Sequence, residues 1–300
     1  MKLVTFLEHG VEALGAVVGD RVLRLDALFS SLVARAPAGK GSHASCAMTR
    51  LIELDGPEFA AVRREVARAA AGAQSPLLLS EIALQAPVPR PGKIVAVGRN
   101  YADHAAETGV KPFEKPRIIA KLPSSVCGPG STVRRPPGVQ KLDFEVELAV
   151  VIGRAARQVA KADALACVAG YTILDDVSAR EFQFDVAPPQ TTFAKSMDDF
   201  CPMGPWLVTA DEVSDPQDLD LRLELNGEPM QSGNTRNMIF SVATLIEYIT
   251  SYMTLEPGDV IATGTPAGIG AFRKPPRWLQ PGDRLALDIT RIGRLEHAIG

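Results

Sequence analysis

From residue 93 onward, the chain is divided into short apolar runs that are interrupted by glycine and proline. Runs of this length that are rich in Val, Ile and Leu are typical of β-strands. The one long apolar stretch predicts a helix from Ser241 to about Leu255, with Ser241 as the N-cap and Glu256-Pro257-Gly258 as the stop. Turns at this spacing favour a β-sandwich or a barrel-like β architecture. The strands are predicted at residues 93–97, 145–152, 170–174, 221–225, 259–262 and 284–289.

The first 85 residues predict a small α/β domain. Leu3-Val-Thr-Phe6 and Ala16-Val-Val18 indicate short strands, and Gly19-Asp20 predicts a hairpin turn. Residues 58–71 have the pattern of an amphipathic helix. The proline-rich stretch that follows favours an extended connection. We therefore expect a mixed α/β, mostly β protein with a domain at 1–85, a linker at 86–92 and a second domain at 93–300.

Composition argues against several classes of partner. The 300 residues carry a formal net charge of only −3, which gives no general attraction to nucleic acid or to an anionic membrane. No stretch approaches the roughly 20 apolar residues of a membrane span, and the first residues do not resemble a signal peptide. The four cysteines form no CxxC pair, which favours free thiols in a reducing compartment. We expect a cytoplasmic protein that acts on a small molecule.

Acidic residues alternate with apolar ones in Asp143-Phe-Glu-Val-Glu147. In a strand, Asp143, Glu145 and Glu147 would share one face. This pattern alone also fits a half-exposed strand with a solvated acidic face. About thirty residues later, however, another predicted strand ends in Asp175-Asp176. Carboxylates from two strands suit a hard divalent cation such as Mg²⁺, and the absence of nearby Cys and His argues against Zn²⁺.

These residues belong to a set of motifs that resembles the fumarylacetoacetate hydrolase family over roughly residues 93 to 290. Six motifs occur in the order found in that family: Val97-Gly-Arg-Asn-Tyr-Ala-Asp-His104, Asp143-Phe-Glu-Val-Glu147, Leu174-Asp-Asp-Val-Ser-Ala-Arg180, Phe193-Ala-Lys-Ser196, Leu225-Asn-Gly-Glu228 and Thr263-Gly-Thr-Pro266. The resemblance implies that Glu145, Glu147 and Asp176 bind Mg²⁺ or Mn²⁺. It also implies a mostly β catalytic fold and a homodimer.

Three further residues are candidates for catalysis. His104 and Glu107 would share a face if a helix begins here, and the carboxylate could then orient the imidazole as a general base. A surface His beside a Glu is the alternative, and the match to the family favours the base. Lys195 could stabilise developing enolate charge, as the resemblance implies, although an exposed lysine with a buried stem is the usual alternative.

Four residues are candidates for substrate binding. Arg180 and Gln183 are three apart, beyond Asp176 on a predicted helix, and the resemblance assigns them to a substrate carboxylate. Without the resemblance, Arg180 would be interpreted as a salt-bridge partner of Asp176. Thr265 matches a substrate contact of the family, and Lys121 lies in a segment that borders its site.

The resulting hypothesis is a metal-dependent hydrolase of a 2,4-dioxo acid, such as an acylpyruvate or a diketo-deoxy sugar acid. In this hypothesis, water is activated by His104, a C–C bond breaks, and pyruvate leaves as its enolate. The same residues would also support oxaloacetate decarboxylation, or keto–enol and double-bond isomerisation of a 2-oxo-dienedioate. A metal-binding protein without catalysis is a further alternative. Family membership by itself does not choose among these reactions.

Overall fold

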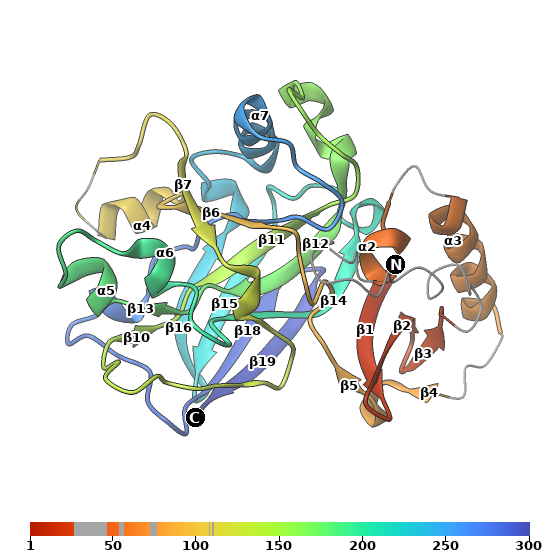
Figure 1. Ribbon diagram of the computed structural model, residues 1–300, viewed down its shortest axis with the longest axis horizontal. Coiled ribbons are helices and arrows are strands. Elements are labelled where there is room, and N and C mark those ends of the chain that lie inside the picture. Colours follow the sequence, from red (N-terminus) through yellow and green to blue (C-terminus); the bar gives the residue numbers. More distant parts are fainter. Residues whose placement is uncertain (27–46, 54–56, 73–76, 108, 110) are drawn as a thin grey trace, which may run out of the picture.

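The computed structural model describes residues 1–26, 47–53, 57–72, 77–107, 109 and 111–300. Within these residues the chain forms a large sheet, a smaller sheet and a few helices (Figure 1). This confirms the mixed, mostly β fold class that the short apolar runs predicted.

The large sheet has twelve strands and is open at both ends in the part of the chain described. It therefore does not close into a barrel. Two strands lie off its main path, since β5 pairs with β1 and β8 pairs with β14. These two are β5 (Ala83–Leu84) and β8 (Val126–Cys127). The main path runs β4 (Leu77–Leu78), β3 (Arg21–Arg24), β2 (Val11–Val18), β1 (Lys2–Glu8), β14 (Cys201–Thr209), β12 (Val168–Asp175), β11 (Val146–Ile152), β17 (Val260–Ala262), β6 (Ile94–Gly98) and β7 (Arg117–Lys121).

A five-stranded sheet packs against the large one. Their shared hydrophobic core joins Val146 and Leu148 of β11 to Leu223 and Leu287 of the smaller sheet. A separate two-stranded ladder pairs β10 (Leu142–Asp143) with β13 (Ser178–Ala179). The order in the smaller sheet is β16 (Glu228–Asn234), β15 (Asp220–Leu225), β18 (Arg284–Ile289), β19 (Gly293–Ile299) and β9 (Thr132–Val133).

Strand β11 is buried on both faces, which explains its nearly continuous apolar sequence. On one face, Val146 and Leu148 belong to the core between the two sheets. On the other face, Ala149 and Val151 belong to a second core, which includes Leu3 of β1. A strand held on both sides is a rigid support for the acidic residues at its beginning.

The helices lie around the sheets (Figure 1). The two long predicted helices are confirmed, as α3 (Pro57–Ala70) and α7 (Val242–Tyr252). The helix predicted after Asp176 begins only at Glu181, so Arg180 precedes it as the N-cap and Asp176 lies outside it. Ser241 caps α7 by accepting a hydrogen bond from the Thr244 N–H at 3.2 Å. Among the described residues, no helix is long and apolar enough to cross a membrane. The shorter helices are α2 (Ala47–Leu51), α4 (Ala102–Glu107), α5 (Glu181–Phe184), α6 (Thr191–Ala194) and the 3₁₀ helices Leu79–Glu81, Pro123–Ser125, Lys161–Cys167, Ala210–Glu212, Thr235–Asn237 and Gly270–Phe272.

The N-terminal strands continue the large sheet. β1 pairs antiparallel with β14, with Lys2 opposite Val208 and Leu3 opposite Leu207. The hairpin predicted at Gly19-Asp20 joins β2 to β3. The segments on either side of residues 86–92 thus share one sheet, while the division into two domains stays a prediction.

Candidate active site

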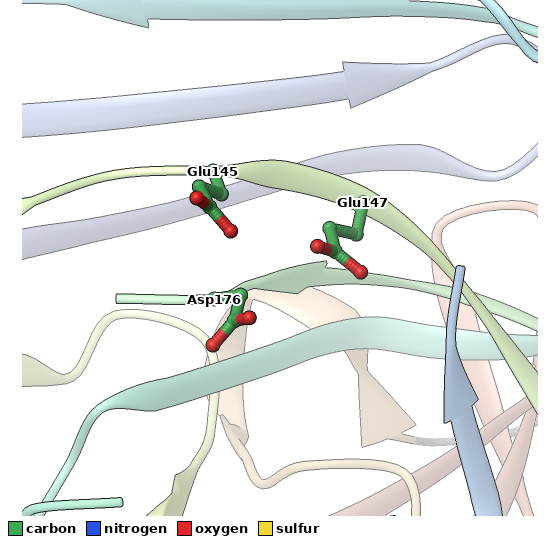
Figure 2. A group of neighbouring side chains, drawn as sticks. All are labelled: Glu145, Glu147 and Asp176. Carbon is green, nitrogen blue, oxygen red and sulfur yellow. The ribbon is translucent and has the colours of Figure 1, made fainter. Parts of the chain in front are cut away.

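Three buried carboxylates converge at one end of the β11–β12 pair. Glu147 lies on β11, Glu145 directly precedes this strand, and Asp176 directly follows β12. The strands are antiparallel, and Val146 lies opposite Asp175. The three acids are the sequence neighbours of these two residues, so they lie close together. One oxygen from each carboxylate lies within 4.8 Å of the other two. Figure 2 shows the three side chains directed toward one shared space.

The side chains alternate here as the sequence predicted. Phe144, Val146 and Leu148 are completely buried in the core between the sheets. Glu145 and Glu147 lie on the other face and are only 6% and 2% exposed. The alternative of a solvated acidic face is therefore wrong.

Arg180 lies between two of the acids. Its Nε donates to Asp143 Oδ2 at 2.8 Å, and its Nη2 donates to Glu145 Oε1 at 2.5 Å. A third bond, from Nη1 to Gln183 Oε1 at 2.8 Å, orients the glutamine. Asp176, the ion-pair partner considered from the i, i+4 spacing, has no ion pair with Arg180 among the described contacts. Arg180 therefore neutralises the beginning of the acidic strand, with N–H groups to spare.

Two lysines lie against Asp176. Lys195 Nζ donates to Asp176 Oδ2 at 2.6 Å, to Glu145 Oε2 at 2.9 Å and to Ser178 Oγ at 2.8 Å. Lys121 Nζ donates to Asp176 Oδ1 at 2.8 Å. Lys195 is 4% exposed, so the alternative of a surface lysine is wrong. An ammonium group has three N–H donors. All three donors of Lys195 are therefore engaged by these three oxygen atoms.

Glu147 forms no ion pair with any residue that the structure describes. Its Oε2 accepts a hydrogen bond from the Gly264 N–H at 2.8 Å, and among the described contacts Oε1 has no partner. Burial raises the pKa of Glu147, and the charges of Asp176 and Glu145 raise it further. Burial also opposes ionisation of Glu145, but Lys195 and Arg180 outweigh it and hold the pKa of Glu145 well below its usual value. The two glutamates are therefore in opposite electrostatic situations.

The balance of buried charge fits a divalent cation. With every group ionised, the site holds four carboxylates and three protein cations, which leaves one formal negative charge. Carboxylate oxygens can accept from a lysine and still offer a lone pair to a metal ion. The donors are all oxygens, as Mg²⁺ and Mn²⁺ prefer. The four carboxylates are those of Asp143, Glu145, Glu147 and Asp176, and the three cations are Lys121, Arg180 and Lys195.

His104 and Glu107 form a pair on α4, at 3.2 Å between Nδ1 and Oε2. The Glu107 carboxylate is itself held by the Gly268 N–H, at 3.1 Å from Oε1 and 3.3 Å from Oε2. The preceding turn is fixed by Asn100, whose side-chain amide donates to the Thr263 carbonyl at 2.8 Å. His104 is 6% exposed. The helix predicted from the three-residue spacing is thus present, and the imidazole has a defined orientation.

A cavity of about 260 Å³ joins these groups. Such a volume suits a small acid and is below the usual range for a drug-sized ligand. Glu107 and Lys121 are not part of its wall; they lie behind His104 and Asp176 respectively. The predicted site residues in the wall are His104, Glu145, Glu147, Asp176, Arg180, Gln183, Lys195 and Thr265.

Thr265 reaches the cavity, but its hydroxyl proton is already used. Oγ1 donates to the Val146 carbonyl at 2.9 Å and accepts from Gln231 Nε2 at 2.8 Å. Gln183, which was also assigned to a substrate carboxylate, is different. Its side-chain N–H₂ group has no acceptor among the described residues.

Sequence reasoning missed a support beneath the acids. Asp175 Oδ1 accepts from the Glu145 N–H at 2.8 Å, and Asp175 Oδ2 lies 2.7 Å from Nε2 of His297 on β19. Both side chains are completely buried. The Asp175-Asp176 pair is visible in the sequence, but no local pattern connects Asp175 to His297. Arg99 and Arg117 in the cavity wall were also missed.

Comparison with known proteins identifies the family of this chain. A family model described as fumarylacetoacetate (FAA) hydrolase C-terminal matches residues 93–300. The chain belongs to the fumarylacetoacetate hydrolase family. This confirms the resemblance predicted from the six motifs.

Members of the fumarylacetoacetate hydrolase family with different reactions are similar to this chain. The human protein named oxaloacetate tautomerase FAHD2A, mitochondrial, is 48% identical over 229 residues, which cover 76% of this chain and 73% of that protein. The crystal structure of maleylpyruvate hydrolase from Sphingobium sp. SYK-6, in complex with manganese(II) and pyruvate, has 32% identity and a TM-score of 0.78, covering 100% of this chain and 98% of that one.

A third relative is an isomerase by name. The structure of 5-carboxymethyl-2-hydroxymuconate delta-isomerase from Mycobacterium smegmatis has 31% identity and a TM-score of 0.74, and covers 100% of this chain and 99% of that one. The family thus includes hydrolase, isomerase and tautomerase relatives of this chain, all named for small-molecule reactions.

Proposed function

We propose that this chain catalyses keto–enol interconversion of a small 2-oxo acid. The observation that supports this most directly is the imidazole of His104, oriented by Glu107, in the same small cavity as the carboxylate cluster. Keto–enol interconversion needs one group that can take and return a proton beside a carbonyl, and this pair supplies it. A relative with 48% identity carries the name of this reaction, with oxaloacetate as its substrate.

In the proposed mechanism, His104 removes a proton from the carbon next to the 2-oxo group. The C–H electron pair becomes the C2–C3 double bond, and the carbonyl electrons move to the 2-oxo oxygen. His104 then returns the proton to this oxygen, so the enol has the same atoms and charge as the keto acid. The Glu107 carboxylate stabilises the imidazolium that exists between the two transfers.

The remaining residues bind and polarise the substrate. A divalent cation held by Glu145, Glu147 and Asp176 would supply Lewis-acid polarisation of the 2-oxo group when bound. The free N–H groups of Arg180 and Gln183 would orient the adjacent carboxylate.

Hydrolytic C–C cleavage of a 2,4-dioxo acid is the second candidate. It uses the same His104, which would take its proton from water instead of carbon. The likeness to maleylpyruvate hydrolase favours it. Oxaloacetate decarboxylation is the remaining alternative and needs no base at this position.

The two candidates can be separated by assays with Mn²⁺. Enol–keto conversion of oxaloacetate is followed by ultraviolet absorbance, and cleavage of an acylpyruvate is followed by pyruvate release. We expect His104→Gln to lower kcat for the tautomerisation by about 10²- to 10⁴-fold. Its Mn²⁺ affinity should stay unchanged, because His104 is not part of the carboxylate cluster. His9→Gln, at an exposed position that is not part of the cavity wall, is the matched control.

Full tautomerase activity of His104→Gln would contradict the proposed role of the histidine. Cleavage of acylpyruvates without oxaloacetate tautomerisation would establish the second candidate.

The cofactor, assembly and location complete the proposal. We propose Mg²⁺ or Mn²⁺ as the cation, a homodimer as the active form and the cytoplasm as the compartment. Manganese(II) is present in the maleylpyruvate hydrolase relative, and the human relative is named mitochondrial. Sedimentation at a mass of 32.0 kDa, that of one chain, would contradict the dimer.

A further inference from the structure

Two arginines that the mechanism does not use lie in the wall of the same cavity. Arg99 directly follows β6, and Arg117 is the first residue of the neighbouring β7. The strands pair antiparallel, with Gly98 opposite Arg117. Both arginines are therefore at one end of this strand pair, next to the turn that leads to His104.

The alternation of β7 directs Arg117 toward the site. Residues two apart in a strand share a face, so Arg117, Ile119 and Lys121 point the same way. Ile119 lines the cavity, and Lys121 reaches Asp176 beneath it. Arg117 occupies the exposed end of this row, whereas Lys121 occupies the buried end. A guanidinium at this position faces the outer part of the cavity.

The backbone at Gly98 and Arg99 makes room for both side chains. A Cβ atom on Gly98 would lie 3.1 Å from Ile119 Cδ1 and 3.5 Å from Arg117 Cδ, so the absence of a side chain lets the Arg117 stem lie across this position. Arg99 has a φ of 58°, in the left-handed region that residues other than glycine rarely adopt. Its guanidinium lies 5.7 Å from the centre of the Phe113 ring. Arg99 is thus held by the fold in an uncommon conformation.

Neither guanidinium has a counter-ion within the described parts of the chain. Burial lowers the pKa of Arg99, and the positive charge of Arg117 lowers it further. Arg180, by contrast, contacts two carboxylates in the same cavity. Two neighbouring cations without an anion in a concave wall are suited to bind one.

The charge of the whole cavity indicates how many anionic groups its ligand carries. The inner cluster has one excess negative charge, so a divalent cation would change it to one excess positive charge. Arg99 and Arg117 add two more positive charges at the outer wall. A monocarboxylate would leave the arginines without a partner, whereas a dicarboxylate would place one anion at each end.

We propose that Arg99 and Arg117 form a subsite for the second carboxylate of the substrate. This inference rests on the proposed function and narrows it, because it makes the substrate a dicarboxylic 2-oxo acid small enough for a cavity of about 260 Å³. The first carboxylate and the 2-oxo group lie at the acidic end, and the second carboxylate accepts hydrogen bonds from the two guanidinium groups.

Binding of stable analogues to the Mn²⁺-loaded protein tests the subsite without turnover. N-oxalylglycine is a dicarboxylic 2-oxo acid analogue that cannot form an enol, and N-ethyloxamate has a methyl group in place of its distal carboxylate. Oxalate occupies the acidic end alone. Dissociation constants are measured by calorimetry for the wild-type chain, Arg99→Gln, Arg117→Gln and the double variant. Arg222→Gln, an exposed position on β15 in the other sheet, is the matched control.

We expect the wild-type chain to bind N-oxalylglycine at least about tenfold more tightly than N-ethyloxamate, which is the usual worth of a charge-assisted hydrogen bond. Each single variant should reduce this preference, and the double variant should abolish it. Oxalate affinity and melting temperature should be unchanged in all variants, and Arg222→Gln should match the wild-type chain throughout.

Two results would overturn the subsite. One is a wild-type chain that binds N-oxalylglycine no more tightly than N-ethyloxamate, or does not bind it. The other is a double variant that keeps the preference, or that weakens all three ligands equally. Failure of the proposed function has a different signature, namely that the wild-type chain shows the preference for the dicarboxylate but does not interconvert keto and enol oxaloacetate.

Discussion

Arg180 and Arg294 each form ion pairs with more than one acid, in very different surroundings. Arg180 lies in the wall of the candidate active-site cavity with 4% of its side chain exposed and binds Asp143 and Glu145. Arg294 lies on β19 with 45% of its side chain exposed. Its partners are Glu224, Asp288 and Glu296. The chemical groups are the same, but the access of water differs.

Water decides what these contacts contribute. Around Arg294, solvent screens the charges and can replace any lost partner, so such pairs contribute little to stability. Around Arg180, a lost partner leaves a charge that water cannot reach, and such a loss is strongly destabilising. The buried network therefore has to be nearly complete in the folded protein. Glu147, without a cation of its own, is the exception that fits a metal ion.

The largest effect on metal binding is expected from neutralising the two glutamates of the cluster separately. Glu145→Gln and Glu147→Gln should each weaken Mn²⁺ binding by about 100-fold or more, since loss of a supporting residue alone has effects of 10- to 100-fold. Their effects on the metal-free protein should differ in sign. Glu147→Gln relieves repulsion and should raise the melting temperature, whereas Glu145→Gln removes the partner of Arg180 and Lys195 and should lower it.

Calorimetry with Mn²⁺ and thermal unfolding in EDTA measure these two effects. Equal shifts of the melting temperature in both variants would contradict the difference between the two glutamates. Unchanged Mn²⁺ affinity in both would refute the metal site.

The largest effect on stability is expected from removing the buried arginine. Arg180→Met should lower the free energy of unfolding of the metal-free protein by about 3–5 kcal/mol, because Asp143 and Glu145 lose a buried cation. Urea unfolding followed by circular dichroism measures it. A loss below about 1 kcal/mol would show that water reaches this network as it reaches Arg294.

The smallest effect is expected at the surface. Arg294→Met should change the free energy of unfolding by no more than about 1 kcal/mol, and any change should decrease as salt is added. The same urea experiment at low and high salt measures it. A loss comparable to that of Arg180→Met would mean that exposure does not distinguish the two networks.

The sequence was most informative where the candidate site residues follow the repeat of a single strand or helix. The alternation in residues 143–148 placed Glu145 and Glu147 on one face, and the strand end at Asp175-Asp176 supplied the third acid. The three-residue spacing of His104 and Glu107 likewise predicted their contact. Each of these inferences needed only the repeat of a strand or a helix.

The missing parts depend on pairings between distant segments. The bond of Arg180 to Asp143 joins residues 37 apart, and the pairing of β10 with β13 that brings them together has no signature in two-residue strands. Thr265 was assigned to the substrate because it matches a substrate contact of the family, but its hydroxyl proton is donated to the Val146 carbonyl on the neighbouring strand. No local sequence pattern identified Arg117, because its place in the cavity wall depends on the pairing of β7 with β6.

The contact between Asp175 and His297 has a consequence for biosynthesis. The two residues are 122 positions apart, and the Asp175 carboxylate also fixes the backbone of Glu145. On the ribosome, the carboxylate cluster therefore emerges long before the histidine that supports it. If the cluster binds a metal as proposed, a nascent chain that ends before β19 should capture Mn²⁺ poorly, and we expect metal loading to follow complete folding.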